Sequence, residues 1–154
     1  MKFFALSKTI TGKKGLEFAE DNEVDVVSCV LPMVIGPFVC PFVPASVYLA
    51  ASLFFATYIE DAVDTHIFLM ENPDVKGRYM CRSIGLSAYD LADFLATAYP
   101  DFNIPITDKI KETKDYKGRS LSTKKLLDAG FKYRHGVKGM YSGLVKSGKE
   151  RGFL

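Results

Sequence analysis

The chain has 154 residues, of which 48% are hydrophobic and 25% charged, which is enough for one domain with a buried core. Its 20 Lys and Arg residues against 18 Asp and Glu leave a net charge of only +2, and the basic residues of the last third are scattered. This disfavours nucleic acid as the main partner, because phosphate binding needs a concentrated basic face.

The chain opens with a predicted helix followed by a predicted buried strand. Residues 4–20 have apolar positions at helical spacing, although two glycines weaken the pattern. These positions include Leu6, Ile10 and Phe18. Residues 25–31, DVVSCVL, are apolar on both faces and are stopped by Pro32, which is typical of a central strand in a parallel sheet covered by helices on both sides. The start therefore predicts α/β layering.

No charged residue occurs from residue 26 to residue 59, a length that raises the question of a membrane span. Four prolines cut the first half of this stretch into pieces that are too short to span a bilayer. Only residues 43–59 could form a continuous apolar helix, at the lower edge of spanning length. The pattern favours a buried strand that leads into a buried loop and helix, with no membrane partner.

The middle of the chain alternates between strands and helices. Residues 55–59 predict a short strand, and residues 60–71 predict a helix with an acidic first turn. Its predicted apolar side consists of Val63, Ile67 and Met70. Residues 77–83 predict another strand. Ser87, with Asp90 three positions later, predicts the N-cap of a helix that closes before Pro100.

The last third is more irregular. Residues 103–118 predict a surface loop, residues 122–129 a short helix that Gly130 ends, and residues 131–133 a short strand. Residues 136–150 contain four glycines, so any helix there is intrinsically weak.

The potentially reactive side chains do not form a recognisable catalytic pattern in the sequence. Three cysteines, at positions 29, 40 and 81, match neither a zinc site nor a disulfide framework, which favours buried thiols in a reducing compartment and no metal site. Asp61 and His66 are five residues apart on one helix and are poorly placed to pair. Tyr48, Tyr58 and Tyr79 are interpreted as core or rim residues. Lysines interrupt any signal-like apolar start, which predicts a cytoplasmic protein.

Several separate motifs carry a resemblance to a known family. They are, in order, FALSKT, EFAEDNEVDVVSCVLPMVIGPFVCPFVPAS, IEDAVDTHIFLMENPDVKGRYMC, AYPDFNIP, STKKLLDAGFKY and KERGFL. Together they resemble the C-terminal half of the plant dihydroflavonol reductase-like group, which are extended short-chain dehydrogenases. The resemblance implies an α/β fold with two segments. Residues 1–36 would be the last helix and strand of an incomplete Rossmann sheet, and residues 37–154 a small substrate-binding region.

The resemblance also implies a cofactor and a mechanism. Family members use NADPH to reduce a carbonyl, and the proton comes from the tyrosine of a Tyr-x-x-x-Lys motif whose lysine contacts the nicotinamide ribose. Lys8 matches that lysine, and Phe4 occupies the tyrosine position. Pro32, Met33 and Val34 match the turn that touches the nicotinamide, and Ser46 matches a serine near the cofactor. The chain has no Gly-rich phosphate-binding turn ahead of its first helix, so NADPH is not expected to bind to this chain alone.

Three hypotheses follow. The first is the substrate-domain portion of an NADPH-dependent carbonyl reductase of plant specialised metabolism, with a phenolic or alkaloid substrate, that is not reductive by itself. The second is a redox-neutral cyclase or isomerase that uses the substrate pocket of the reductase family. The third is a non-catalytic protein that pairs with a full-length relative through the open edge of its incomplete sheet.

Overall fold

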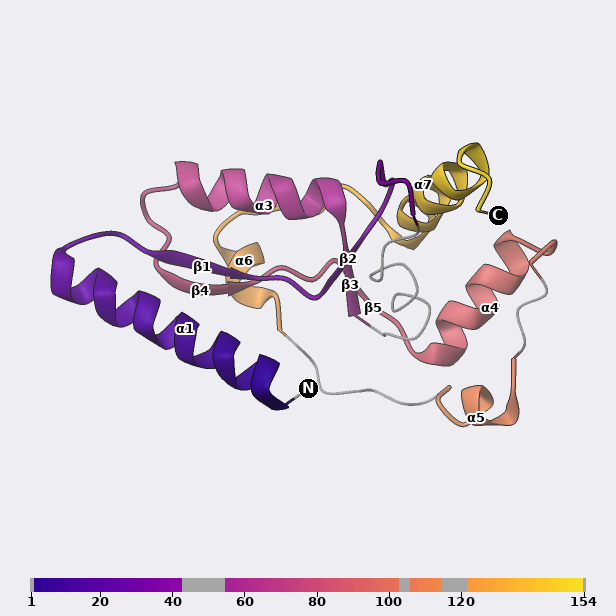
Figure 1. Ribbon diagram of the computed structural model, residues 1–154, viewed down its shortest axis with the longest axis horizontal. Helices are drawn as coiled ribbons and strands as arrows, with labels where there is room; N and C mark the ends of the chain where they lie inside the picture. Colours follow the sequence, from indigo (N-terminus) through magenta and orange to yellow (C-terminus); the bar gives the residue numbers. More distant parts are fainter. Residues whose placement is uncertain (1, 43–54, 103–105, 115–121, 154) are drawn as a thin grey trace.

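The computed structural model describes residues 2–42, 55–102, 106–114 and 122–153. Its elements, in chain order, are α1 (Lys2–Asn22), β1 (Val27–Val30), β2 (Met33–Ile35), β3 (Phe55–Tyr58), α3 (Ile59–Glu71), β4 (Gly77–Met80), β5 (Ile84–Gly85), α4 (Ala88–Ala98), α5 (Asp108–Lys111), α6 (Lys124–Asp128) and α7 (Val137–Glu150). Figure 1 shows a layered part that contains α1, β1, β4 and α3, and a second part that contains α4, α5 and α7.

Two small sheets follow one another along the chain. β1 pairs in parallel with β4, with Val27 opposite Gly77, and β2 pairs in parallel with β3, which is antiparallel to β5. Only Leu31 and Pro32 separate β1 from β2, so the chain changes its strand partner at Pro32. The prediction that Pro32 ends the first strand is confirmed. β2 was not predicted, because three residues are too few for a pattern to identify.

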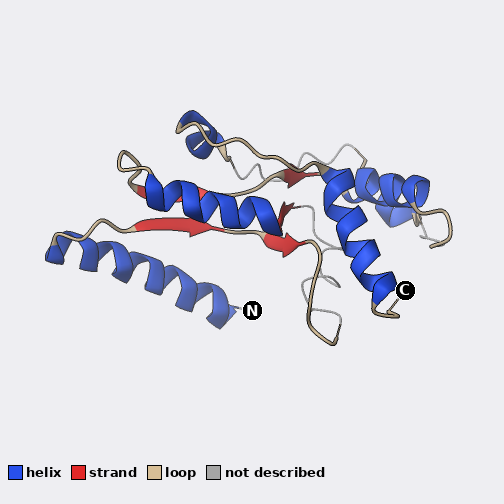
Figure 2. Ribbon diagram, turned by 90° about the horizontal axis from the view of Figure 1, so that it is seen from above, coloured by secondary structure: helices blue, strands red, loops and turns tan. Residues whose placement is uncertain are grey.

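Helices α1 and α3 lie on opposite sides of the β1–β4 pair, which confirms the predicted α/β layering (Figure 1). Seen from above, α1 runs along the side of β1 that faces away from β4 (Figure 2). Within the described residues β1 has a single strand partner, β4, so its central position in a larger sheet stays a prediction. All four of its residues are only half-buried.

Helix α3 has the predicted length but buries a different face. Asp61, Ala62, Thr65 and Leu69 are its buried residues. The prediction that Val63, Ile67 and Met70 form the core-facing side is wrong, since all three are exposed. The face that packs on the sheet instead combines small and polar side chains, whose buried polar groups must be hydrogen-bonded.

Two clusters of buried side chains hold the described part of the chain together. One joins α4 and α7 to β2 and β3 and consists of Ile35, Ala56, Tyr58, Leu91, Met140, Tyr141 and Leu144. The other joins β4 to α3 and α6 and consists of Leu69, Val75, Tyr79, Cys81, Leu126 and Phe131. Helix α7 therefore forms despite its glycines because it packs against the first cluster.

The predicted ends of α4 and α6 are confirmed. Ser87 Oγ accepts the backbone N–H of Asp90 at 3.0 Å, and Gly130 has a φ of 100°, which favours glycine after a helix. Residues 131–133 form no strand, so that prediction is wrong. Their aromatic side chains pack instead, with Phe131 in the second cluster and Tyr133 Oη accepting the Arg82 N–H at 2.8 Å.

Candidate functional site

Helix α1 presents Phe4 and Lys8 one turn apart. Lys8 Nζ lies 5.6 Å from the centre of the Phe4 ring, within reach of a cation–π contact. Phe4 is 68% exposed, so its ring contributes little to the core. The structure therefore brings together the two residues that the sequence singles out, on a helix face that is open to solvent.

Both residues line a hollow between α1 and the sheet, with a volume of about 480 Å³. Ser28, Leu31 and Arg78 form part of its opposite wall. Its lining includes the cations Lys8, Lys13 and Arg78 and no acidic residue of the described part of the chain. The hollow is thus suited to a polar or anionic group rather than to a cation.

The other predicted contact residues lie further along the chain. Pro32 links β1 to β2, and Met33 and Val34 belong to β2. They follow the carboxyl end of β1, and ligands of open α/β sheets bind outside the carboxyl ends of the strands. Ser46 and Tyr48 lie outside the described residues.

A polar cluster surrounds the start of α3. The rings of Tyr58 and His135 have their centres 4.3 Å apart, and His135 Nε2 lies 3.0 Å from a carboxylate oxygen of Glu60. Burial, followed by the charges of Glu60 and Asp61, raises the pKa of Tyr58. A phenol that is held neutral in this way is a weaker proton donor than one beside an ammonium group.

Asp61 is fully buried in the same cluster. One of its carboxylate oxygens accepts the Arg134 backbone N–H at 2.9 Å, while the Arg134 side chain bonds to Asp64. The other oxygen of Asp61 has no hydrogen-bond partner in the described part of the chain. His66 Nδ1 lies 2.7 Å from the Ala62 carbonyl oxygen, so the prediction that Asp61 and His66 do not pair is confirmed.

The thiol of Cys81 is the centre of a second polar cluster. Thr65 Oγ1 lies 3.1 Å from its sulfur and Thr57 Oγ1 lies 3.9 Å away. A hydrogen bond from Cys29, followed by those from the two threonines, lowers the pKa of Cys81 against the effect of burial. The same Cys29–Cys81 bond raises the pKa of Cys29. These three contacts join residues far apart in sequence, so no spacing could have predicted them.

The interpretation of the cysteines as buried thiols is correct for Cys81, whereas Cys29 and Cys40 are only half-buried. No group of three or more metal-ligating His, Cys, Asp or Glu side chains occurs within residues 2–42, 55–102, 106–114 and 122–153. No helix of that same part is long and apolar enough to cross a membrane.

Comparison with known proteins gives the class of protein. No family model matches the chain. It superposes on the crystal structure of vestitone reductase from alfalfa (Medicago sativa) with a TM-score of 0.84 and 34% identity, over 98% of this chain and 53% of that one. The structure of yeast methylglyoxal/isovaleraldehyde reductase Gre2 with NADPH gives a TM-score of 0.69 at 22% identity, over 92% and 49%. The fold is that of a short-chain reductase.

Comparison of sequences identifies relatives of this chain among plant proteins. Vestitone reductase of Medicago sativa is 35% identical over 163 residues, which are 98% of this chain and 50% of the relative. Noscapine synthase SDR1 of Papaver somniferum is 34% identical over 164 residues, covering 98% and 47%. Dihydroflavonol 4-reductase of Callistephus chinensis is 34% identical over 164 residues, covering 98% and 45%.

The chain therefore belongs to the plant dihydroflavonol reductase-like family of extended short-chain dehydrogenases, as the sequence motifs predict. It spans about half the length of the curated relatives that it matches, which is consistent with their C-terminal half.

Proposed function

We propose that the chain is the substrate-side portion of an NADPH-dependent carbonyl reductase of plant specialised metabolism and that it does not reduce carbonyls by itself. The observation that carries the proposal is the Phe4–Lys8 pair. Its spacing and its place beside β1 are those of a Tyr-x-x-x-Lys site, but a phenylalanine ring has no proton to donate. The names of the relatives support a phenolic or alkaloid substrate.

The residues of the chain fit one end of the cofactor only. The Lys8 ammonium group is suited to hold ribose hydroxyls, with Pro32, Met33, Val34 and Ser46 as further contacts. The diphosphate of NADPH calls for backbone N–H groups at a Gly-rich turn before a helix, and these 154 residues contain no such motif. We therefore infer that NADPH does not bind to this chain alone.

The division into a sheet segment, residues 1–36, and a substrate-binding segment, residues 37–154, is part of the proposal. The end of β1 before Pro32 supports a change near this point, although β2, within the first segment, pairs with β3 of the second. β4, from the second segment, pairs with β1 of the first, so the two segments fold together.

A titration of the 154-residue chain with NADPH, followed by cofactor fluorescence, tests the cofactor inference. We expect no saturable signal at micromolar concentrations. The Phe4→Tyr variant should behave in the same way and should not turn over vestitone, the substrate in its relative's name. Saturable micromolar binding, or turnover by Phe4→Tyr alone, would overturn the proposal.

A fusion tests the positive half of the proposal. The part of vestitone reductase that has no counterpart here would be joined upstream of this chain, with Phe4 retained, changed to Tyr, or changed to Leu. We expect all three fusions to bind NADPH and only Phe4→Tyr to reduce the carbonyl, because a phenol beside an ammonium group has a lowered pKa. Failure of all three fusions to bind NADPH would contradict the substrate-side assignment.

A further inference from the structure

Two of the three cysteines meet beneath helix α3. Cys29 of β1 lies opposite Tyr79 of β4, and Cys81 follows Tyr79 by two residues. Side chains two residues apart along a strand point to the same face of the sheet, so both thiols face the same side. Cys81 Sγ lies 3.1 Å from Thr65 Oγ1 of α3, which identifies that side as the one that α3 covers. The two thiols share a hydrogen bond in which Cys29 is the donor.

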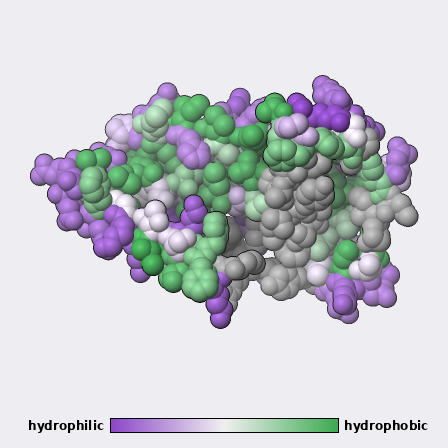
Figure 3. Space-filling view, viewed as in Figure 1, coloured by the Kyte–Doolittle hydropathy of each residue, from purple (hydrophilic) through white to green (hydrophobic). Residues whose placement is uncertain are grey.

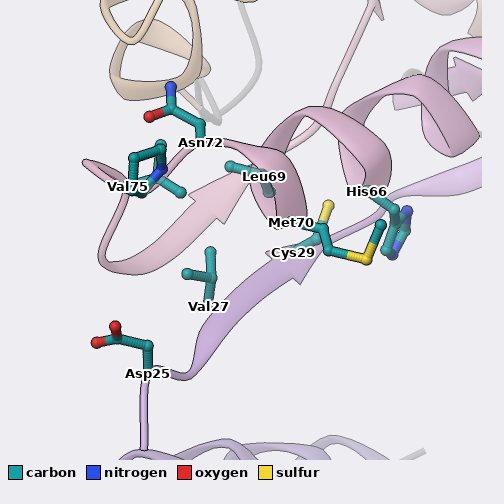
Figure 4. A pocket seen from close by; sticks show the side chains of 9 residues that line it. Asp25, Val27, Cys29, His66, Leu69, Met70, Asn72 and Val75 are labelled. Atoms are coloured by element: carbon teal, nitrogen blue, oxygen red, sulfur yellow. The ribbon is translucent and has the colours of Figure 1, made fainter.

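The pair borders a hollow between β1 and α3. The hollow has a volume of about 540 Å³, and Cys29 lines it together with His66, Leu69 and Met70 of α3. Figure 4 shows the Cys29 side chain between β1 and α3. Cys81 is fully buried, whereas Cys29 is half-buried. A small molecule in the hollow therefore approaches Cys81 past Cys29.

The hydrogen bond between the two thiols gives them different chemical roles. It is the main cause that lowers the pKa of Cys81 to about 6 against the effect of burial, and the hydroxyls of Thr65 and Thr57 act in the same direction. The same bond, followed by burial, raises the pKa of Cys29. The thiolate is the form of cysteine that reacts with oxidants. Cys81 is therefore the sulfur that attacks, and Cys29 keeps a proton that it can release afterwards.

We propose that Cys29 and Cys81 form a redox-modification site, which a small hydroperoxide converts reversibly into an intramolecular disulfide. The proposal does not depend on the proposed function, because it uses only side chains of β1, α3 and the segment after β4. Hydrophobic residues cover α3 beside the site (Figure 3), among them Ile67 and Met70. Such surroundings favour a small neutral oxidant over glutathione disulfide, which is large and charged.

The oxidation takes place in two steps. The Cys81 thiolate attacks one oxygen of hydrogen peroxide, the O–O bond breaks, and the leaving hydroxide takes up the proton that Cys81 had released, which gives water and a sulfenic acid on Cys81. The Cys29 sulfur then attacks the Cys81 sulfur, the S–O bond breaks, and the hydroxide leaves as water with the Cys29 proton. The two sulfurs together lose two electrons, which reduce the peroxide to water. A dithiol returns the electrons and restores both thiols.

The positions of the two cysteines make the disulfide easy to reduce. Diagonal neighbours on adjacent strands have Cα atoms about 7–8 Å apart, whereas disulfides usually span about 4.4–6.8 Å. Closure therefore draws Cys81 toward Cys29 and strains the hydrogen bond from the Cys81 N–H to the Val30 carbonyl oxygen, which is 3.0 Å long in the reduced chain. Strained disulfides are the labile ones, which suits a reversible modification.

The test is treatment of the folded 154-residue chain with hydrogen peroxide, followed by alkylation of free thiols and mass spectrometry. We expect a loss of about 2 Da, a cross-linked peptide pair that contains Cys29 and Cys81, and full reversal by dithiothreitol. Cys40 should remain open to alkylation, and Cys40→Ser, the matched control, should oxidise in the same way. A disulfide that includes Cys40, or irreversible oxidation of Cys81 without a cross-link, would overturn the proposal.

Two variants test the roles of the two sulfurs. Cys29→Ala removes the half-buried thiol, so the chain should stay folded and accumulate a sulfenic acid on Cys81, which dimedone traps. Cys81→Ala should trap no dimedone at Cys29. Labelling of Cys29 and not of Cys81 would show that the roles are assigned wrongly.

Hydrogen exchange gives a measurement on the unmodified sequence, which does not depend on how well a variant folds. The Cys81 amide should exchange faster in the oxidised chain than in the reduced chain, because the bond to the Val30 carbonyl oxygen is strained on closure. Exchange of the Cys81 amide at the same rate in both forms would contradict the movement that the disulfide requires.

Discussion

The first and last helices of the chain differ in what surrounds them. Helix α1 has 21 residues and buries none of them, although several of its apolar side chains are exposed. Helix α7 has 14 residues and three glycines, and it packs into the core. Its buried residues are Met140, Tyr141, Leu144, Ser147 and Gly148.

The contrast shows that glycine content did not decide which helix is held by the core. Each glycine costs about 1 kcal/mol relative to alanine, whereas burial of one large apolar side chain contributes about 1.5–3 kcal/mol. Helix α7 therefore offsets its glycines through contacts within the chain. Helix α1 buries no side chain against the described residues, so its apolar side chains stay exposed.

Removing a buried side chain from α7 should give the largest effect. Met140 is fully buried, so Met140→Ala is expected to lower the free energy of unfolding by about 2–5 kcal/mol, measured by urea denaturation. Met70→Ala is the matched control, because Met70 is 80% exposed and its loss should change stability by less than about 0.5 kcal/mol. Equal losses at the two positions would remove the contrast between packed and open faces.

Glycine-to-alanine changes should have opposite signs in the two helices. A Cβ at Gly143 would lie 3.2 Å from Pro37 Cδ and 3.2 Å from Tyr58 Oη, so we expect Gly143→Ala to destabilise by about 1–2 kcal/mol. A Cβ at Gly12 would meet nothing within 4 Å, so Gly12→Ala should stabilise by about 0.5–1 kcal/mol. The midpoints of thermal unfolding would report both signs. Stabilisation by both changes would mean that Gly143 is not needed for close approach.

Short-range sequence signals predicted where helices begin and end better than they predicted which faces of the helices pack against the rest of the fold. The cap at Ser87 and the glycine after α6 depend on groups a few residues apart, so the sequence alone identified them. The buried face of α3 did not follow its apolar stripe, because Asp61 and Thr65 bury their polar groups through partners elsewhere in the fold. The periodicity of apolar residues alone cannot show which face of a helix packs against the rest of the fold.

The same distinction applies to the candidate site. Phe4 and Lys8 are one helical turn apart, so their proximity followed from the sequence. The contacts of Tyr58 with His135 and of Cys81 with Thr65 join residues distant in sequence, and only the fold brings them together. No spacing within α1 indicates β1, so only the structure shows that Lys8 lines a hollow beside that strand.

Loss of the α4 cap should have a moderate effect. Ser87→Ala removes the acceptor for the Asp90 N–H and should cost about 1 kcal/mol, whereas Ser87→Asp keeps an acceptor and should cost less. Urea denaturation of the three proteins provides the measurement. If Ser87→Asp loses as much stability as Ser87→Ala, the hydrogen bond is not the source of the effect.

The smallest effect on the isolated chain is expected at the exposed apolar face of α1, where Ile10→Lys should change the free energy of unfolding by less than about 0.5 kcal/mol. Thr11→Lys, at an exposed polar position on the same helix, adds the same charge and serves as the matched control. If Ile10→Lys instead destabilises the chain alone by more than 1 kcal/mol, α1 is packed within the chain, and the contrast between its two terminal helices is wrong.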